Sequence, residues 1–213
     1  MFAVRPANPK RITIADGSDY NGQNPKNPRG WDWMFPKNTT APDIRTPQGI
    51  KYFQERALAW MNTSVQYCLN YMGDGAAKGP ARCQGLTVWS LEGQEYPQTI
   101  SYIGAPDMLM ELAPEMDAVA DRLFRLVTDA GLKCGVTLRP QQLTLTPGWK
   151  PGDKGFKYYQ RNLLNPDNTS DVDAVAALLV RKASYAFKRW GCTMFYTDTT
   201  CVISYQSVRG TRR

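Results

Sequence analysis

The chain has 213 residues, of which 42% are hydrophobic and 21% charged, and it carries a formal net charge of +7 with no histidine. This length and composition favour one globular domain, residues 1–213, with a sizeable core. The absence of histidine excludes a Ser-His-Asp triad, a Cys-His pair and a His-ligated metal centre. Because Lys and Arg are spread along the chain rather than clustered, we expect no nucleic-acid partner.

The cysteine and hydropathy patterns bear on the cellular compartment. The five cysteines show no CxxC spacing, and Cys134 and Cys192 fall at core positions of expected strands, which indicates reduced thiols. No apolar run approaches the roughly eighteen residues of a membrane span, and Met1–Lys10 lacks the pattern of a signal peptide. We therefore expect no membrane association and, by default, a cytoplasmic location.

The first expected strand is RITIAD, Arg11–Asp16, and a long loop rich in Gly, Pro, Asn and Trp follows it to Arg45. The first expected helix runs from Pro47 to Met72, with Thr46 placed to cap it. Its apolar residues recur at helical spacing, which predicts a face that covers a sheet. This face comprises Ile50, Phe53, Ala57, Trp60, Met61, Ser64 and Cys68.

The second strand, LTVWSLE, is expected over Leu86–Glu92, and a loop over 93–113 leads to a helix over Pro114–Ala130 that Gly131 closes. The apolar stripe of this helix comprises Met116, Val119, Ala120, Leu123, Val127 and Ala130. A third strand, CGVTLR, follows at Cys134–Arg139. These near-continuous apolar runs are typical of buried parallel strands.

After the third strand we expect a loop over 140–169, a helix over Asp171–Trp190 closed by Gly191, and a fourth strand, CTMFYTD, over Cys192–Asp198. The apolar face of this helix comprises Val172, Val175, Leu178, Leu179, Ala183, Ala186 and Trp190. Loops of this length in a compact domain are usually functional or disordered, and their aromatic and Gly/Pro/Asn content fits ordered binding loops.

The element order βαβαβαβ predicts an α/β fold with a parallel sheet. Neither GxGxxG nor GxxxxGK[ST] occurs, so a dinucleotide-binding or P-loop fold is not favoured. The remaining architecture is the (βα) unit of a TIM barrel, in which long loops at the carboxyl ends of the strands build the site. A complete barrel has eight such strands, and the sequence provides about four, which predicts a partial (half) barrel.

Six segments of the chain are distinctive, namely DGSDYNGQNPKNPRGWDW, VWSLEGQEYP, SYIGAP, LAPEMDAVAD, GVTLRPQ and RWGCTMFYTD. Together they resemble a bacterial family of glycoside hydrolase-like proteins with a TIM-barrel catalytic domain. The resemblance extends over nearly the whole chain to about Asp198. More distantly, an acid that ends the fourth strand is similar to the nucleophile position of alpha-galactosidase-type barrels. Those enzymes usually have Lys two residues before that Asp, where this chain has Tyr196.

The resemblance implies glycoside hydrolysis by two carboxyl groups, about 5–5.5 Å apart for retention of configuration and about 6.5–9.5 Å apart for inversion, with no metal or cofactor. Asp198 is the expected nucleophile, since it ends the fourth strand. Glu92 is the second catalytic candidate, as acid or as a residue that orients sugar hydroxyls. A structural ion pair between Glu92 and Arg139 is the alternative.

Other strand-end and loop residues are candidates for substrate binding. Arg139 can hold a carboxylate through two hydrogen bonds or act as a buried counter-ion. Glu95 lies three residues after Glu92. The first loop contributes four side chains suited to sugar hydroxyls and pyranose faces, namely Asp16, Asp19, Trp31 and Trp33. Asp16 also fits an ordinary turn, and Trp89 is expected in the core.

Two alternatives concern what the strand-end residues do. An acidic cluster can bind Ca²⁺ or Mg²⁺, but no EF-hand spacing occurs and we expect no metal. The chain can also be a non-catalytic half-barrel that binds carbohydrate or associates with a second copy, because an open half-barrel exposes strand edges. A homodimer that completes the barrel is the partner this second interpretation predicts.

Overall fold

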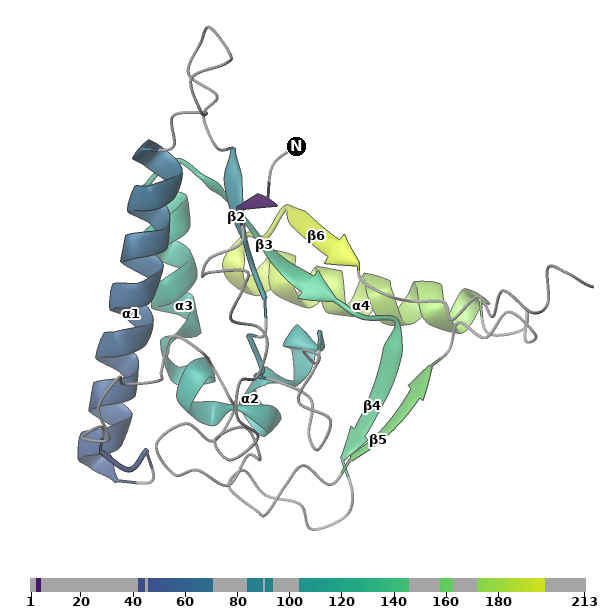
Figure 1. Ribbon diagram of the computed structural model, residues 1–213. Coiled ribbons are helices and arrows are strands. Elements are labelled where there is room, and N and C mark those ends of the chain that lie inside the picture. Colours follow the sequence, from purple (N-terminus) through teal and green to yellow (C-terminus); the bar gives the residue numbers. More distant parts are fainter. Residues whose placement is uncertain are drawn as a thin grey trace, which may run out of the picture.

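The computed structural model describes residues 3–4, 42–44, 46–70, 84–89, 91–93, 104–145, 158–162 and 172–197 (Figure 1). The strands are β1 (Ala3–Val4), β2 (Gly85–Val88), β3 (Lys133–Leu138), β4 (Gln141–Leu145), β5 (Tyr158–Asn162) and β6 (Met194–Thr197). The helices are α1 (Pro47–Asn70), the 3-10 turn η3 (Pro106–Met108), α2 (Leu109–Leu112), α3 (Pro114–Asp129) and α4 (Val172–Trp190). The order confirms the mixed α/β class.

The main sheet has the strand order β1-β2-β3-β6, and every neighbouring pair is parallel. Strands that follow one another along the chain are therefore neighbours in this sheet. Doubly wound nucleotide-binding sheets instead reverse their order near the middle. The sequential order agrees with repeated βα units and places the carboxyl ends of β2, β3 and β6 at one edge of the sheet.

The first two expected strands differ from what the structure describes. The strand expected over Arg11–Asp16 lies outside the described residues, and the segment that pairs with β2 is Ala3–Val4. The second strand is shorter than expected, because β2 ends at Val88 and Leu91 and Glu92 form a turn. Glu92 therefore lies just beyond the strand rather than within it.

The three long helices lie close to their expected positions. The Thr46 hydroxyl accepts a 3.0 Å hydrogen bond from the Gly49 amide, which confirms Thr46 as the cap of α1. Gly131 and Gly191 follow α3 and α4 with φ of 73° and 70°, the left-handed conformation that closes helices. Glycine, which lacks Cβ, adopts this conformation without steric cost.

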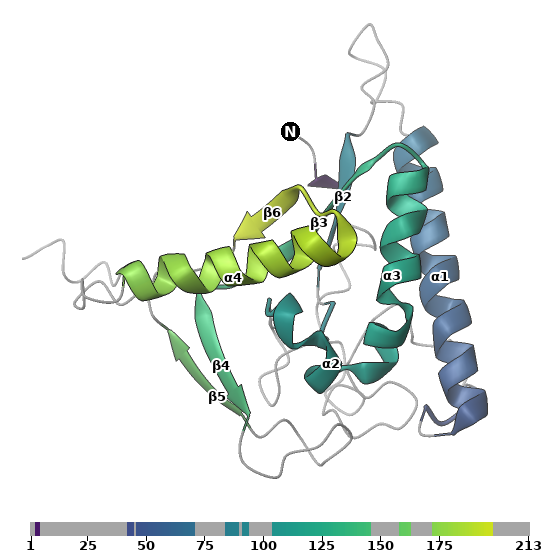
Figure 2. The same ribbon diagram turned by 180° about the vertical axis from the view of Figure 1, so that it is seen from behind.

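The core lies between the sheet and the helices α1 and α3, which run side by side in both views (Figures 1 and 2). It includes Leu86 and Val88 of β2 with Cys134, Val136 and Leu138 of β3. From α1 the buried residues are Gly49, Phe53, Ala57, Met61, Val65 and Cys68. The prediction of Ile50 in this face was wrong, because the stripe follows an i, i+4 row that leaves Ile50 39% exposed.

Helix α4 joins the same core through its carboxyl end. The Trp190 ring stacks on Phe124 of α3 with centroids 4.6 Å apart, and Tyr185 meets Trp190 edge-on at 5.5 Å. Arg189 bonds the Asp121 carboxylate at 2.8 Å and also pairs with Asp117, so polar contacts reinforce the apolar contact between the two helices. Figure 2 shows α4 in front of β3 and β6.

Two segments expected to be loops contain secondary structure. The 93–113 connection includes η3 and α2, which together form a short helical segment before α3. The 140–169 connection includes β4 and β5, which pair antiparallel with Gln141 opposite Asn162. In Figure 1 this two-stranded sheet extends directly from the carboxyl end of β3.

Strand β6 forms an edge of the described sheet. Its first residue, Met194, is buried, whereas Phe195 and Tyr196 are 40% and 41% exposed. These two side chains point to opposite faces, because successive strand residues alternate. Both faces of the outer strand are therefore accessible, in contrast to β2, in which all four residues are buried.

Candidate functional site

Glu92 and Arg139 are the expected site residues that the structure describes, and it brings them to one edge of the sheet. Glu92 follows β2, and Arg139 follows β3 directly. The other candidates lie outside the described residues, namely Asp16, Asp19, Trp31, Trp33, Glu95 and Asp198. Asp198 is the next residue after the end of β6 at Thr197. The structure therefore describes the site only where it is formed by the carboxyl ends of β2 and β3 and by the elements packed on them.

Glu92 is a buried acid, with 2% of its surface exposed. Burial raises its pKa from 4.5 to about 7, because the charged carboxylate loses its hydration. Hydrogen bonds from its own amide and from the Gly104 amide lower the pKa, as does the charge of Lys182. The net pKa leaves Glu92 partly protonated near neutral pH, so this carboxyl group can donate or accept a proton there.

Lys182 of α4 is the residue that sequence reasoning missed. It is 1% exposed, and its Nζ donates to the carbonyl oxygens of Arg139 at 2.7 Å and Gly104 at 2.9 Å. Burial lowers the pKa of Lys182 to about 8, while the negative charges of Asp107 and Glu92 act to raise it. The ammonium therefore links α4 to the segments that follow β2 and β3.

The burial of Lys182 could have been predicted from the sequence. The buried positions of α4 follow an i, i+3 and i+4 row, and Lys182 occupies that row between Leu178 and Ala186. A lysine within an apolar stripe either extends its ammonium to water or requires buried acceptors. Here the two backbone carbonyls supply those acceptors.

Gly104 and Arg139 bring two chain segments into close contact. The Arg139 amide donates to the Gly104 carbonyl at 3.1 Å, and Gly104 has a φ of 65°. A Cβ on Gly104 would lie 2.8 Å from the Arg139 nitrogen, closer than packed atoms tolerate. Arg139 is 8% exposed, as a buried structural residue would be. Glu92, Gly104, Arg139 and Lys182 together form what we call the buried rim cluster.

Asp107 and Arg181 lie at the border of this cluster. The Arg181 Nε donates to Asp107 Oδ2 at 2.9 Å, with the arginine side chain 61% exposed. Asp107 is the second residue of η3, and its charge also acts on Glu92 and Lys182. Because the arginine partner is largely exposed to solvent, an ion pair of this kind contributes little to stability, about 0–1 kcal/mol. Its main effect here is on the electrostatics of the buried groups.

An aromatic pair lies near the same edge. Trp89 follows β2, and its ring centroid is 4.9 Å from that of Tyr196 in β6, with the planes at 37°. The register pairs Tyr196 with Thr137, on the face opposite the buried Val136 and Leu138. Trp89 is partly buried rather than in the core, which corrects the expectation for this residue. The pair presents partly exposed aromatic surface at the strand ends.

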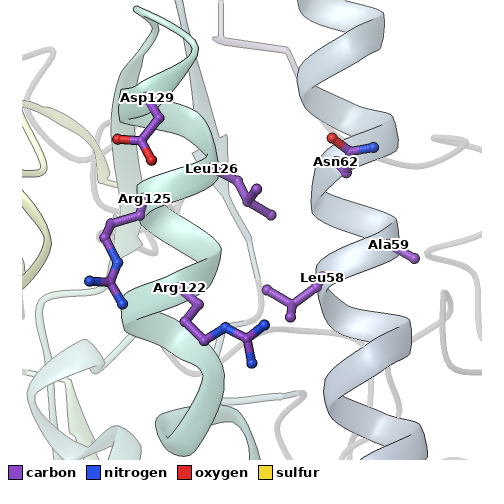
Figure 3. A pocket seen from close by; sticks show the side chains of 7 residues that line it. All are labelled: Leu58, Ala59, Asn62, Arg122, Arg125, Leu126 and Asp129. Atoms are coloured by element: carbon purple, nitrogen blue, oxygen red, sulfur yellow. The ribbon is translucent and has the colours of Figure 1, made fainter.

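Elsewhere among the described residues, one groove lies apart from the strand ends. An open groove of about 480 Å³ lies between α1 and α3, lined by Leu58 and Leu126 with Arg122, Arg125 and Asp129 (Figure 3). It belongs to the helical layer, away from the carboxyl ends of the strands. Among the described residues, no group of three or more His, Cys, Asp or Glu side chains is placed to hold a metal ion.

The cysteines expected in the core are buried there. Cys134 and Cys192 are free thiols with their sulfur atoms 3.7 Å apart, and the Cys134 thiol also donates to the Trp190 carbonyl. The separation exceeds the roughly 2.05 Å of a disulfide. These side chains fill space between β3 and the end of α4, as the sequence predicts.

Comparisons with family models, with curated proteins and with solved structures find no match. The site is therefore interpreted from its own chemistry. In the described part of the chain, no helix is both long enough and apolar enough to cross a membrane.

Proposed function

We propose that this chain is a glycoside hydrolase-like domain built from the βα units of a TIM barrel and that it acts on or binds a carbohydrate. In a completed barrel, Asp198 is proposed as the nucleophile and Glu92 as the carboxyl that transfers the proton or orients sugar hydroxyls. Neither group requires a metal or a cofactor for this chemistry. The parallel sheet with its strands in sequential order supports the barrel-type arrangement, in which catalytic residues lie at the carboxyl ends of the strands.

The observation that carries this proposal is the position and ionisation of Glu92. Glycoside hydrolysis needs one carboxyl group that is protonated near neutral pH and one that is ionised. Glu92 lies at the carboxyl edge of the sheet with a pKa of about 7, which suits the first role. Asp198, the next residue in the chain after β6, is proposed for the second.

The Trp89–Tyr196 pair supports carbohydrate as the ligand class. The apolar face of a pyranose packs on aromatic rings, and its hydroxyls bind carboxylates and carbonyls. Tyr196 is 41% exposed and precedes Asp198 by two residues in the chain. A sugar stacked on this pair would therefore contact the residues that immediately precede the proposed nucleophile.

The test is hydrolysis of a panel of aryl glycosides and oligosaccharides by the full chain. Asp198→Asn should abolish turnover and keep the fold, and Glu92→Gln should slow turnover and remove the fall in rate on the alkaline side of the pH profile. A control variant, Lys188→Met on the exposed side of α4, should leave the rate unchanged. Turnover that survives Asp198→Asn at the wild-type rate would contradict the assignment.

The exposed edge at β6 supports a second candidate, a non-catalytic half-barrel that associates with another copy. Phe195 and Tyr196 are both about two-fifths exposed, and Val180 and Phe187 of α4 are 63% and 57% exposed. Unpaired strand edges with apolar neighbours favour association. Sedimentation velocity distinguishes the candidates: Phe195→Lys should convert a dimer to a monomer, and a wild-type monomer at all concentrations would reject this second function.

A further inference from the structure

We infer that Lys182 is the positioning residue of the proposed carbohydrate site: its buried ammonium fixes the segments that carry Gly104 and Arg139 beside Glu92. The inference rests on the proposed function only in that it treats the buried rim cluster as part of a carbohydrate site. The positioning and the electrostatic effect are properties of the chain that can be measured separately.

The contacts of Lys182 show how it positions the other groups. Its Nζ donates to two carbonyl oxygens from different segments, that of Arg139 after β3 and that of Gly104 before η3. The Arg139 amide in turn donates to the same Gly104 carbonyl. Three elements, α4, the end of β3 and the segment before η3, are therefore joined at one ammonium.

The Gly104 segment connects this arrangement to Glu92. The Gly104 amide donates to the Glu92 carboxyl, while its carbonyl accepts from Lys182. A displacement of Gly104 would therefore change both the hydrogen bonding and the charge around Glu92. Because the cluster is buried, water cannot easily replace these contacts.

Three charged groups act on Glu92 and Lys182 from the elements packed around them. Asp107 on η3 favours the charged form of Lys182 and the neutral form of Glu92, and Arg181 and Arg139 favour the neutral form of Lys182. Lys182 is the cation that lowers the pKa of Glu92. Loss of the ammonium leaves the carboxyl buried next to Asp107, where the neutral acid is favoured.

The experiment measures the titration of Glu92 in the full chain by ¹³C NMR of labelled glutamate carboxyls, with Glu92→Gln to assign the resonance. Lys182→Met should move the pKa of Glu92 upward by at least about one pH unit, as expected for the loss of a nearby opposite charge. Lys182→Arg should keep the pKa near the wild-type value. The matched control, Lys188→Met on the same helix, should leave it unchanged.

The wild-type protein provides a measurement that does not depend on variant folding. The ¹⁵N resonance of the Lys182 ammonium should titrate near the pKa of about 8. An ordinary value near 10.4 would show that burial does not weaken the charged form of this ammonium and would overturn the electrostatic part of the inference. An unchanged Glu92 pKa in a folded Lys182→Met variant would also overturn it.

Measurements of sugar binding by the same variants distinguish this inference from the proposed function. If the chain binds sugar, Lys182→Met should shift the pH profile of binding in the same direction as the pKa of Glu92, and Lys188→Met should not. If no sugar binds but the Glu92 pKa shifts as expected, the proposed function fails and the positioning role stands.

Discussion

Replacement of Gly104 by alanine should destabilise the protein far more than the same replacement at Gly131. Both glycines have positive φ, 65° and 73°, so alanine pays the left-handed conformational cost of about 1–2 kcal/mol at each. At Gly131 no atom lies within 4 Å of the new Cβ. The reduced freedom of the unfolded chain offsets part of that cost by about 0.4–1 kcal/mol. We expect a net loss of about 1 kcal/mol there.

At Gly104 a second cost adds to the first. The new Cβ would lie 2.8 Å from the Arg139 nitrogen and 2.8 Å from its Cγ. The nitrogen is backbone and cannot rotate away, so the Lys182 contacts must shift. Overpacking of this kind costs about 1–3 kcal/mol, which gives a total loss of about 2–4 kcal/mol for Gly104→Ala.

The assay is reversible urea unfolding of the wild type and both variants, with stability obtained by linear extrapolation. Gly131→Ala is the matched control, since it carries the same φ requirement without the contact. Equal stability losses in the two variants, within about 0.5 kcal/mol, would refute the close packing of Gly104 against Arg139 and with it the geometry of the buried rim cluster.

Two other predictions concern the charged groups. Because the pKa of Glu92 is raised from 4.5 to about 7, the folded state binds the extra proton between these values, and the contribution of Glu92 to stability falls by about 3 kcal/mol as pH rises through them. Urea titrations should show this fall in the wild type and a flatter profile in Glu92→Gln; identical profiles would contradict the shift. Arg189→Ala should cost about 1–2 kcal/mol, because its charge-assisted hydrogen bonds join α3 and α4 with the side chain 24% exposed. Arg181→Ala, with the side chain 61% exposed, should cost about 0–1 kcal/mol, and the reverse order in thermal unfolding would reject this ranking.

The helices were predictable because their signals are local. The apolar spacing of α3 recurs through four turns, and Gly131 closes it, so the expected end at Ala130 lies one residue from the observed Asp129. The same reasoning failed for Ile50, since one step around α1 moves a side chain by about 100° and out of the buried row. The spacing of apolar residues predicts that a helix has a buried face, but it does not predict which residues lie at the border of that face.

The β4 and β5 pair was not predicted because its stability depends on non-local contacts. Leu145 pairs with Tyr158, and the strands are joined by a long stretch rich in Gly and Pro. Neither five-residue segment is a strong strand signal alone, and two strands gain stability from what they pack against. The sequence pattern therefore favoured a loop.

The site was predictable in part. The ends of apolar runs identified Glu92 and Arg139, because parallel strands in one sheet end at one edge. The sequence suggested that these two residues pair with each other. The structure adds Lys182 from α4, 43 residues after Arg139 in the chain, as the cation that acts on Glu92. Such a contact depends on how a helix packs across the sheet, which periodicity does not specify.

The most direct test of a carbohydrate site at this edge is ¹⁹F NMR of the chain labelled with 5-fluorotryptophan and titrated with a panel of oligosaccharides. Trp89→Phe assigns its resonance, and Trp190, buried against Phe124, is the internal control. The account predicts a saturable shift of the Trp89 resonance that Tyr196→Ala weakens at least about tenfold in affinity, about 1.4 kcal/mol, while Trp190 stays unchanged. Saturable sugar binding that leaves Trp89 unmoved, or no binding of any sugar, would contradict it.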